Sequence, residues 1–362
     1  MAATWDFLVG KTDLGRAERR EGPAPEAIAL AEGEVLLEVE RFALTANNIT
    51  YGAMGESFGY WRFFPAPEGW GRIPVWGFAK VVRSNAPDVA VGTRVFGYLP
   101  MSSHFKAQLK RTGHGLVDTA THRAELPPTY NQYAEVLADD GQGDDRQGDY
   151  RALLRPLFMT SFLIDDWLAR QGDFGAGSVM LSSASSKTAL GLAWLLARRG
   201  VKVVGLTSPA NKAFLEGLGI FHQVALYDDI PSLTAPTPIA YVDFAGNPAV
   251  IGAVHHRVAD DLVHSAIVGA THWQAGGSGA GGELPGPPRS LFFAPDHIRA
   301  RIKEGGPEAL DRDFAAALSQ FVTASPWLKL RHYAGPDGLA QAYREVLDGR
   351  ASPDTGHIII PA

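Results

Sequence analysis

The feature that most constrains the fold is a regular alternation of apolar strands and helices between residues 152 and 268. Short runs rich in Val, Ile and Leu predict strands, and segments with apolar residues at helical spacing separate them. The predicted strands are 178–181, 201–206, 223–227, 239–244 and 262–268, and the predicted helices are 152–170, 188–199, 211–218 and 249–258. Such alternation is typical of βαβ units, so we expect an α/β protein with a Rossmann-type, doubly wound parallel sheet.

The first 135 residues show a different pattern. Residues 34–44 alternate as a half-buried strand does, and 75–83 and 93–98 predict further strands with turn residues between them. Short strands at this spacing predict a small β-barrel as a second domain. Between the two patterns, residues 139–149 carry five aspartates without apolar anchors. A metal site is one interpretation of them, and we favour a solvated loop.

Composition excludes several classes of function. The 362 residues suffice for two domains, and their 46% hydrophobic and 20% charged content is that of a globular protein. A net charge of -6 without a long basic run argues against nucleic-acid binding. With no cysteine, no disulfide and no thiolate metal site can form, and we predict no metal. Neither a signal peptide nor a membrane-spanning run is recognisable, so we expect a cytoplasmic protein without membrane contact.

The turn after the strand 178–181 is the candidate dinucleotide site. In a Rossmann fold this turn and the following helix N-terminus bind a diphosphate through backbone N–H groups, and glycines allow the close approach. Here small hydroxyl residues and one lysine replace the glycines. The candidate residues are Ser182, Ser183, Ser185, Ser186, Lys187 and Thr188. The alternative is a plain serine-rich helix cap with an exposed lysine.

The end of the second strand favours one cofactor over the other. NAD-preferring sites place an acidic residue there to bind the ribose 2′-hydroxyl. Residues 203–212 contain no acid and instead offer Thr207, Ser208 and Lys212, which suit a 2′-phosphate. We therefore predict NADP(H) as the cofactor.

Aromatic residues are dense between the predicted strands 34–44 and 75–83 and at the start of the second of them. Nine of them fall between residues 51 and 78, and such walls suit a small hydrophobic or aromatic substrate. The alternative is ordinary core packing. We assign Tyr60 and Tyr51 as candidate proton donors, and as candidate substrate contacts Trp61, Phe64, Trp76, His272 and Trp273.

Histidines contribute weaker signals. His272 follows the strand 262–268, at the sheet edge where doubly wound folds bind ligands, although a packed or surface histidine is the alternative. His255 and His256 lie in the middle of a predicted helix and are interpreted as solvated.

Taken in order, these segments resemble the medium-chain dehydrogenase/reductase superfamily, in its zinc-independent quinone and enoyl reductase branch. Thr45 and Asn48 occupy the two polar positions of that family's Asn-x-x-Asp turn. Gly92–Val95 occupies the position of its Gly-Asp-Arg-Val turn. Asp243–Gly246 resembles its Asp-x-x-Gly. The chain departs from the pattern in its lack of cysteine, at His357, where the family has lysine, and at the glycine places, which are Ser183, Ser186 and Ala189. We infer a divergent bacterial branch of unknown function.

The resemblance implies a GroES-like barrel in residues 1–150, a Rossmann domain in 151–290 and a return to the barrel domain in 291–362. It also implies an NADPH-dependent oxidoreductase that reduces an enone, quinone or other hydrophobic acceptor as a homodimer. The resemblance implies that Tyr227 lies near the 2′-phosphate and that Thr160, Ala245 and Gly246 lie near the nicotinamide ribose. Thr160 is also a candidate to hold a substrate carbonyl. Gly269 and Thr271 follow the strand 262–268, at the sheet edge where ligands bind, and are further candidate cofactor contacts. Two alternatives remain, a lyase or isomerase on the same fold, and an NADPH-binding protein without turnover.

Overall fold

The computed structural model describes residues 3–136, 146–268 and 284–361. These residues form two compact units. The first comprises Met1–Arg155 and Pro326–Ala362, and the second comprises Pro156–Ser325. This division places residues 291–325 in the second unit, whereas the sequence-based boundary lies at residue 291.

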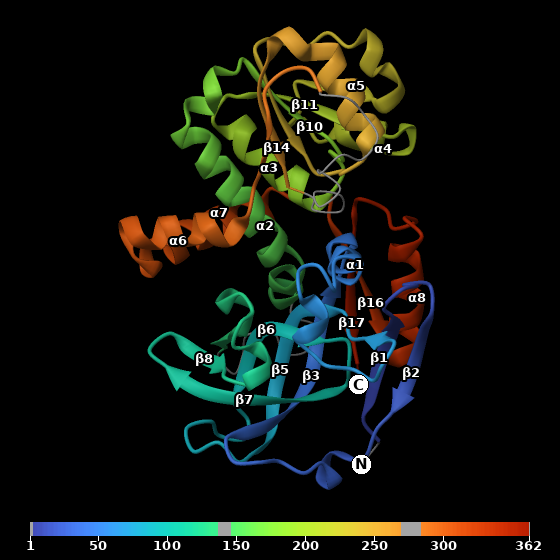
Figure 1. Ribbon diagram of the computed structural model, residues 1–362, viewed down its shortest axis with the longest axis vertical. Helices are drawn as coiled ribbons and strands as arrows, with labels where there is room; N and C mark the ends of the chain where they lie inside the picture. The colour runs from blue at the N-terminus through green and yellow to red at the C-terminus, as the bar shows by residue number, and fades with distance from the viewer. Residues whose placement is uncertain (1–2, 137–145, 269–283, 362) are drawn as a thin grey trace. The chain divides into compact units, whose positions relative to one another are not determined.

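The first unit is built around a closed antiparallel barrel, as the sequence pattern predicted (Figure 1). Pairing of its first strand with its fourth along the chain closes the ring. In spatial order the barrel strands are β3 (Glu34–Leu44), β5 (Pro74–Ser84), β6 (Arg94–Pro100), β9 (Gln132–Glu135), β8 (Gly115–Asp118) and β7 (His104–Thr112). Side chains that alternate inward along these strands form the core, among them Val35, Leu37, Val39 and Val81.

The C-terminal residues extend this barrel sheet. Strand β17 (Thr355–Ile360) pairs antiparallel with β3, and β16 (Lys329–Ala334) pairs parallel with β17. Helix α8 (Gly335–Leu347) connects them and buries Leu339, Ala342 and Tyr343 in the barrel core. A parallel pair requires a crossover of this kind because its strands run in the same direction.

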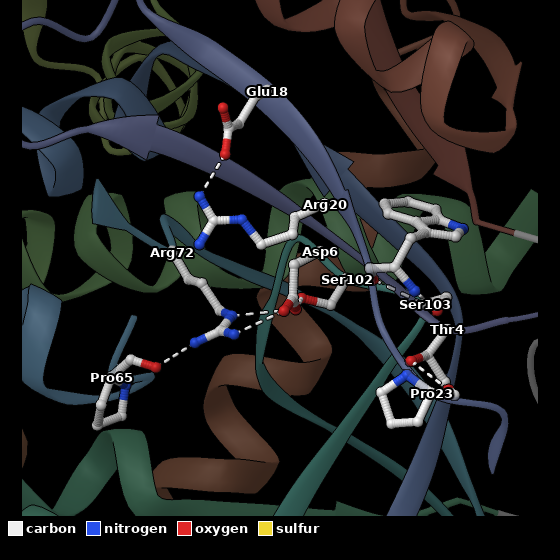
Figure 2. Close-up of polar contacts among 10 residues, drawn as sticks. Thr4, Asp6, Glu18, Arg20, Pro23, Pro65, Arg72, Ser102 and Ser103 are labelled. Atoms are coloured by element: carbon white, nitrogen blue, oxygen red, sulfur yellow. Dashed lines mark hydrogen bonds and ion pairs between the residues drawn. The ribbon is translucent and has the colours of Figure 1, made fainter. Parts of the chain in front are cut away.

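A small sheet of β1 (Trp5–Gly10), β2 (Ala17–Glu21) and β4 (Trp70–Gly71) anchors the aromatic segment. Arg72 donates to both carboxylate oxygens of Asp6, at 3.0 and 2.6 Å, and to the Pro65 carbonyl. Ser102 donates to the same carboxylate at 2.6 Å. Figure 2 shows these side chains converging on Asp6. The bidentate pair fixes residues 65–72, which lie within the aromatic-rich segment 51–78.

The second unit contains a six-stranded parallel sheet flanked by helices (Figure 1). Its strand order is β12-β11-β10-β13-β14-β15. The chain adds strands outward from β10 to β12 and then returns to the other side of β10 with β13, so the strand order reverses between β10 and β13 while all strands stay parallel. The strands are β10 (Ser178–Leu181), β11 (Lys202–Thr207), β12 (Gln223–Leu226), β13 (Ile239–Asp243), β14 (Leu262–Ile267) and β15 (Arg289–Leu291). The predicted doubly wound sheet is confirmed.

Helices complete both units. They are α1 (Ala46–Ala53), α2 (Arg146–Arg170), α3 (Lys187–Arg198), α4 (Pro209–Gly217), α5 (Pro248–Val258), α6 (Ala294–Gly305) and α7 (Pro307–Thr323). Short 3₁₀ turns are η1 (Pro25–Ala27), η2 (Tyr60–Arg62), η3 (Thr121–Arg123), η4 (Pro128–Asn131), η5 (Gly172–Gly175), η6 (Tyr227–Ser232) and η7 (Ala259–Asp261). Among the described residues, no helix combines the length and apolarity needed to cross a bilayer.

The interpretation of residues 139–149 as a solvated loop is wrong for residues 146–149, the part of this segment that the structure describes. Residues 146–149 form the first turn of α2, and Asp149 is buried. Its carboxylate accepts from Arg41 at 2.8 Å and lies 2.7 Å from the His332 Nε2. A buried carboxylate needs such partners because desolvation of an unpaired charge is costly. Residues 139–145 lie outside the described part of the chain.

Candidate functional site

The turn between β10 and α3 follows a path that normally requires glycine. Ser183 has φ +46°, in the left-handed region, where an L side chain costs about 1–2 kcal/mol. Its carbonyl accepts from Ser186 N at 2.8 Å, and Ala184 N donates to the Leu206 carbonyl at 3.1 Å. The backbone therefore keeps a tight turn although the glycine is absent.

The N-terminus of α3 leaves donors available. Ser186 is the N-cap, and its hydroxyl accepts from Ala189 N at 3.3 Å. Within the described residues, the backbone N–H groups of Ser185 and Thr188 have no hydrogen-bond partner. Both residues are half-buried. Uncapped N–H groups and the positive end of the helix dipole favour an anion at this position.

Gly191 of α3 allows α3 to pack closely against α2. A Cβ at Gly191 would lie 2.7 Å from the Ser161 hydroxyl oxygen of α2. That hydroxyl donates to the Thr188 carbonyl at 2.7 Å, so it joins the two helices at the start of α3. Thr160, predicted to lie near the nicotinamide, is the half-buried neighbour of Ser161 on α2.

A buried carboxylate joins the ends of the two central strands. The Ser182 hydroxyl donates to Asp243 at 2.5 Å, and it accepts from the N–H groups of Phe244 and Ala245 at 2.9 and 3.0 Å. The other Asp243 oxygen accepts from Gly246 N at 3.1 Å. The structure thus brings Ser182, Ala245 and Gly246 together where the strand order reverses, which is where doubly wound sheets bind ligands.

Tyr227 lies against the same turn. Its hydroxyl oxygen accepts from Ser183 N at 2.9 Å. Burial, together with the Asp243 carboxylate, raises the pKa of Tyr227, so the phenol is neutral near pH 7. The resemblance implied a position beside the 2′-phosphate, and that role stays a prediction. In this structure the hydroxyl holds the turn between β10 and α3 through Ser183 N.

The residues predicted to select the cofactor follow β11. Thr207 ends the strand and is buried, and Ser208 is the N-cap of α4. The Lys212 ammonium lies 4.0 Å from Glu216, one helical turn away. Asn211 donates to the Ser185 hydroxyl at 3.0 Å and so ties this segment to the first turn. Residues 203–212 contain no carboxylate, and their donors match the chemistry of a phosphate.

The first unit contains an aromatic nest, which we define as Tyr51, Tyr60, Trp76, Tyr98 and Tyr130. Ring centroids are 4.6 Å apart for Tyr51 and Tyr60, 4.7 Å for Tyr98 and Tyr130, and 5.1 Å for Trp76 and Tyr98. Burial raises the pKa of all four phenols, so each is a neutral O–H group near pH 7. Tyr60, Trp76 and Tyr130 are half-buried, whereas Tyr51 and Tyr98 are buried.

Two other predicted substrate contacts lie in the core. Trp61 is 4% exposed and packs against Gly55 and Gly71 so closely that a Cβ at either glycine would lie within 2.4 Å of its ring. Phe64 is also buried, under the Arg123 guanidinium, which lies 4.6 Å from its centroid. Because Trp61 and Phe64 are buried, ordinary core packing is favoured over substrate contact for both.

Several residues escaped sequence reasoning. Tyr98 and Tyr130 belong to the nest, but neither lies in the aromatic-rich segment. The interpretation of His255 as solvated is wrong, because its ring is buried and bonded to the Pro285 carbonyl and the Ser265 hydroxyl, both at 2.9 Å. Gly269, Thr271, His272 and Trp273 lie outside the described residues. In the described part of the chain, no three His, Asp or Glu side chains form a group that could hold a metal ion.

Comparisons with known proteins place this geometry in context. A family model described as "Protein of unknown function (DUF2855)" matches residues 42–352. No curated protein matches the sequence significantly. CurA from Vibrio vulnificus, solved alone and with NADPH, is similar in structure, with a TM-score of 0.61, 12% identity and 99% coverage of both chains.

Two further solved structures have the same architecture. The mycobacterial protein Rv1454c, complexed with NADPH, has a TM-score of 0.56 and 17% identity over 99% of this chain and 100% of its own. A mutant enoyl thioester reductase from Candida tropicalis has a TM-score of 0.55 and 12% identity over the same shares. At these identities the likeness establishes the fold alone, a barrel unit joined to a doubly wound parallel sheet, as the sequence pattern predicted.

Proposed function

Because the chain belongs to the DUF2855 family, whose description leaves the activity open, we propose a function from its site: an NADPH-dependent reductase of enones, quinones or related hydrophobic acceptors. The β10–α3 turn is the observation that carries this proposal. It combines the left-handed Ser183 with the N–H groups of Ser185 and Thr188, which lack partners among the described residues. The described loop thus offers donors to a diphosphate despite its missing glycines.

The cofactor preference rests on the segment after β11. Ser208 and Lys212 would hold a 2′-phosphate, and the absence of an acid removes the usual partner of an NAD ribose. CurA and the mycobacterial protein are themselves solved with NADPH, which supports the same choice for a chain of this fold. The N–H groups of Ala245 and Gly246 are held by Ser182 and Asp243, a set of hydrogen bonds that we call the Ser182–Asp243 brace. Held in this way, Ala245 and Gly246 would adjoin the nicotinamide ribose.

When bound, NADPH supplies a hydride to an activated C=C bond or to a quinone. The chain must then orient the acceptor and deliver a proton. Tyr60 and Tyr51 are the proposed proton donors because each carries a phenolic proton and their rings lie 4.6 Å apart in the aromatic nest. Thr160 would hold an oxygen of the substrate. With no cysteine, the thiolate zinc sites of related alcohol dehydrogenases have no ligands here, so we propose zinc-independent chemistry.

The loss of nicotinamide absorbance, followed with 1,4-naphthoquinone or an enone such as 3-penten-2-one, tests this proposal. We expect NADPH to be consumed only when the acceptor is present, with NADH a poorer reductant. Acceptor conversion without NADPH consumption would instead select a lyase or isomerase. Saturable NADPH binding without turnover on any acceptor would select a binding protein. A cytoplasmic location and a homodimer remain predictions.

A further inference from the structure

Two polar groups of the aromatic nest are buried without a hydrogen-bond partner in the part of the chain that the structure describes. Trp76 on β5 and Tyr98 on β6 are register neighbours across the barrel sheet, so their side chains share one face. Neither the Trp76 Nε1 nor the Tyr98 hydroxyl has a hydrogen-bond partner among the described residues. The Trp76 N–H favours the ionised form of Tyr51, although it does not reach the Tyr51 oxygen with ordinary hydrogen-bond geometry.

Such a pair calls for an acceptor that the described chain does not supply. Buried polar groups in native proteins are nearly always paired, because a missing partner forfeits the free energy of solvation. Most other buried hydroxyls here follow that rule. Tyr133 donates to the Tyr98 carbonyl at 2.9 Å, and Tyr343 donates to the Leu14 carbonyl at 2.8 Å. Two unpaired donors on facing strands therefore mark a place for an oxygen atom.

The surroundings indicate which kind of oxygen fits. Arg123 is the cation whose charge acts on Tyr98, but Asp118 neutralises it through a buried ion pair at 3.3 Å. No net positive charge remains on that pair to offset a carboxylate, whose desolvation is expensive. Tyr51, Tyr60 and Tyr130 add flat apolar faces around the two donors. A neutral carbonyl on a planar conjugated skeleton matches this combination.

We propose that the Trp76 N–H and the Tyr98 O–H form a two-donor clamp for a carbonyl oxygen of the acceptor, which makes quinones and conjugated enones the preferred ligands. This inference rests on the proposed function and narrows its substrate class. Trp76, Tyr60 and Tyr130 are each partly exposed to solvent. The clamp would also stabilise the negative charge that such an oxygen gains during reduction.

Calorimetric titration of the full chain with 1,4-naphthoquinone, without NADPH, tests the clamp. The absence of cysteine prevents thiol adducts with the probe. Tyr98→Phe and Trp76→Phe, which each delete one donor, should weaken naphthoquinone binding roughly tenfold. Tyr343→Phe, which deletes a paired hydroxyl elsewhere in the first unit, should leave it unchanged. Naphthalene, which has no oxygen, should bind wild type and Tyr98→Phe equally.

Urea unfolding of the same variants gives a second, independent readout. Deleting an unpaired hydroxyl should leave the unfolding midpoint unchanged or raise it, whereas deleting the paired Tyr343 hydroxyl should lower it. No naphthoquinone binding to wild type, equal affinity in Tyr98→Phe, or a lower midpoint in Tyr98→Phe than in Tyr343→Phe would each overturn the clamp.

The clamp and the proposed function fail in different ways. If wild type binds naphthoquinone through the clamp but does not bind NADPH, the reductase assignment falls and the clamp stands. If NADPH reduces the quinone equally well in wild type and Tyr98→Phe, with equal quinone affinity, the clamp falls and the reductase assignment stands.

Discussion

The Ser182 hydroxyl donates to the Asp243 carboxylate at 2.5 Å and so joins the carboxyl ends of β10 and β13, residues 61 positions apart in the chain. Phe244 and Ala245 donate their N–H groups back to the same hydroxyl. One serine thereby sets the spacing of the two loops between which a dinucleotide would lie.

Ser182→Ala removes this brace. We expect a loss of about 1–3 kcal/mol in the free energy of unfolding, because the buried carboxylate and two N–H groups lose a partner. NADPH binding should weaken as well, since Ala245 and Gly246 are no longer held. Urea unfolding and calorimetry measure the two effects. Ser232→Ala, at an exposed serine of η6, is the control and should change neither. Unchanged stability in Ser182→Ala would show that the brace is dispensable.

Ser183→Gly returns a glycine to the left-handed position of the turn. Relief of the strain at φ +46° outweighs the added freedom of the unfolded chain, so stability should rise by about 0.5–1 kcal/mol. The Ser183 N–H stays in place, so NADPH affinity should be retained. Thermal unfolding and calorimetry check both expectations. Lower stability in Ser183→Gly would mean that the serine side chain supports the turn.

Lys212→Glu tests the basis of cofactor choice. A carboxylate there would repel a 2′-phosphate and could accept from a ribose hydroxyl, so NADPH affinity should fall at least tenfold while NADH affinity holds or rises. Lys202→Glu makes the same charge change at the opposite end of β11, where Lys202 is exposed, and should alter neither affinity. An unchanged ratio of the two affinities in Lys212→Glu would refute the assignment.

His255 should give the second unit a pH dependence. Burial lowers the pKa of His255, so below about pH 6.5 the unfolded chain takes up a proton that the folded ring refuses. The contribution of His255 to the free energy of unfolding should therefore be fully present above that pH. It should decrease as the pH drops, by at most about 1.4 kcal/mol per pH unit. His255→Gln should flatten the slope of urea midpoints between pH 7 and 5. His256→Gln, at its exposed neighbour, should not. Equal slopes in wild type and His255→Gln would contradict the pH dependence that we assign to His255.

Sequence reasoning succeeded where the signal is local. The strand 178–181, its serine turn and the following helix are read from neighbouring residues, and the structure places β10 and α3 within one residue of the prediction. Tyr51, Tyr60 and Trp76 all come from the aromatic-rich segment, and the structure gathers them in one nest, while their roles toward a substrate stay predictions.

The residues that were missed depend on long-range pairing. Tyr98 joins Trp76 only because β5 and β6 align in one register, and a lone tyrosine in a barrel strand gives no such signal. The helical pattern around His255 gives no sign of burial, because its partner Pro285 lies 30 residues away. The polar segment around Asp149 gives none either, because its partner Arg41 lies 108 residues away.

The most direct test of the account is a crystal structure of the chain with NADPH. We predict diphosphate oxygens within hydrogen-bond distance of the Ser185 and Thr188 N–H groups, and the 2′-phosphate beside Ser208 and Lys212. A turn that remains closed by its own side chains, with NADPH absent or bound elsewhere, would contradict the account.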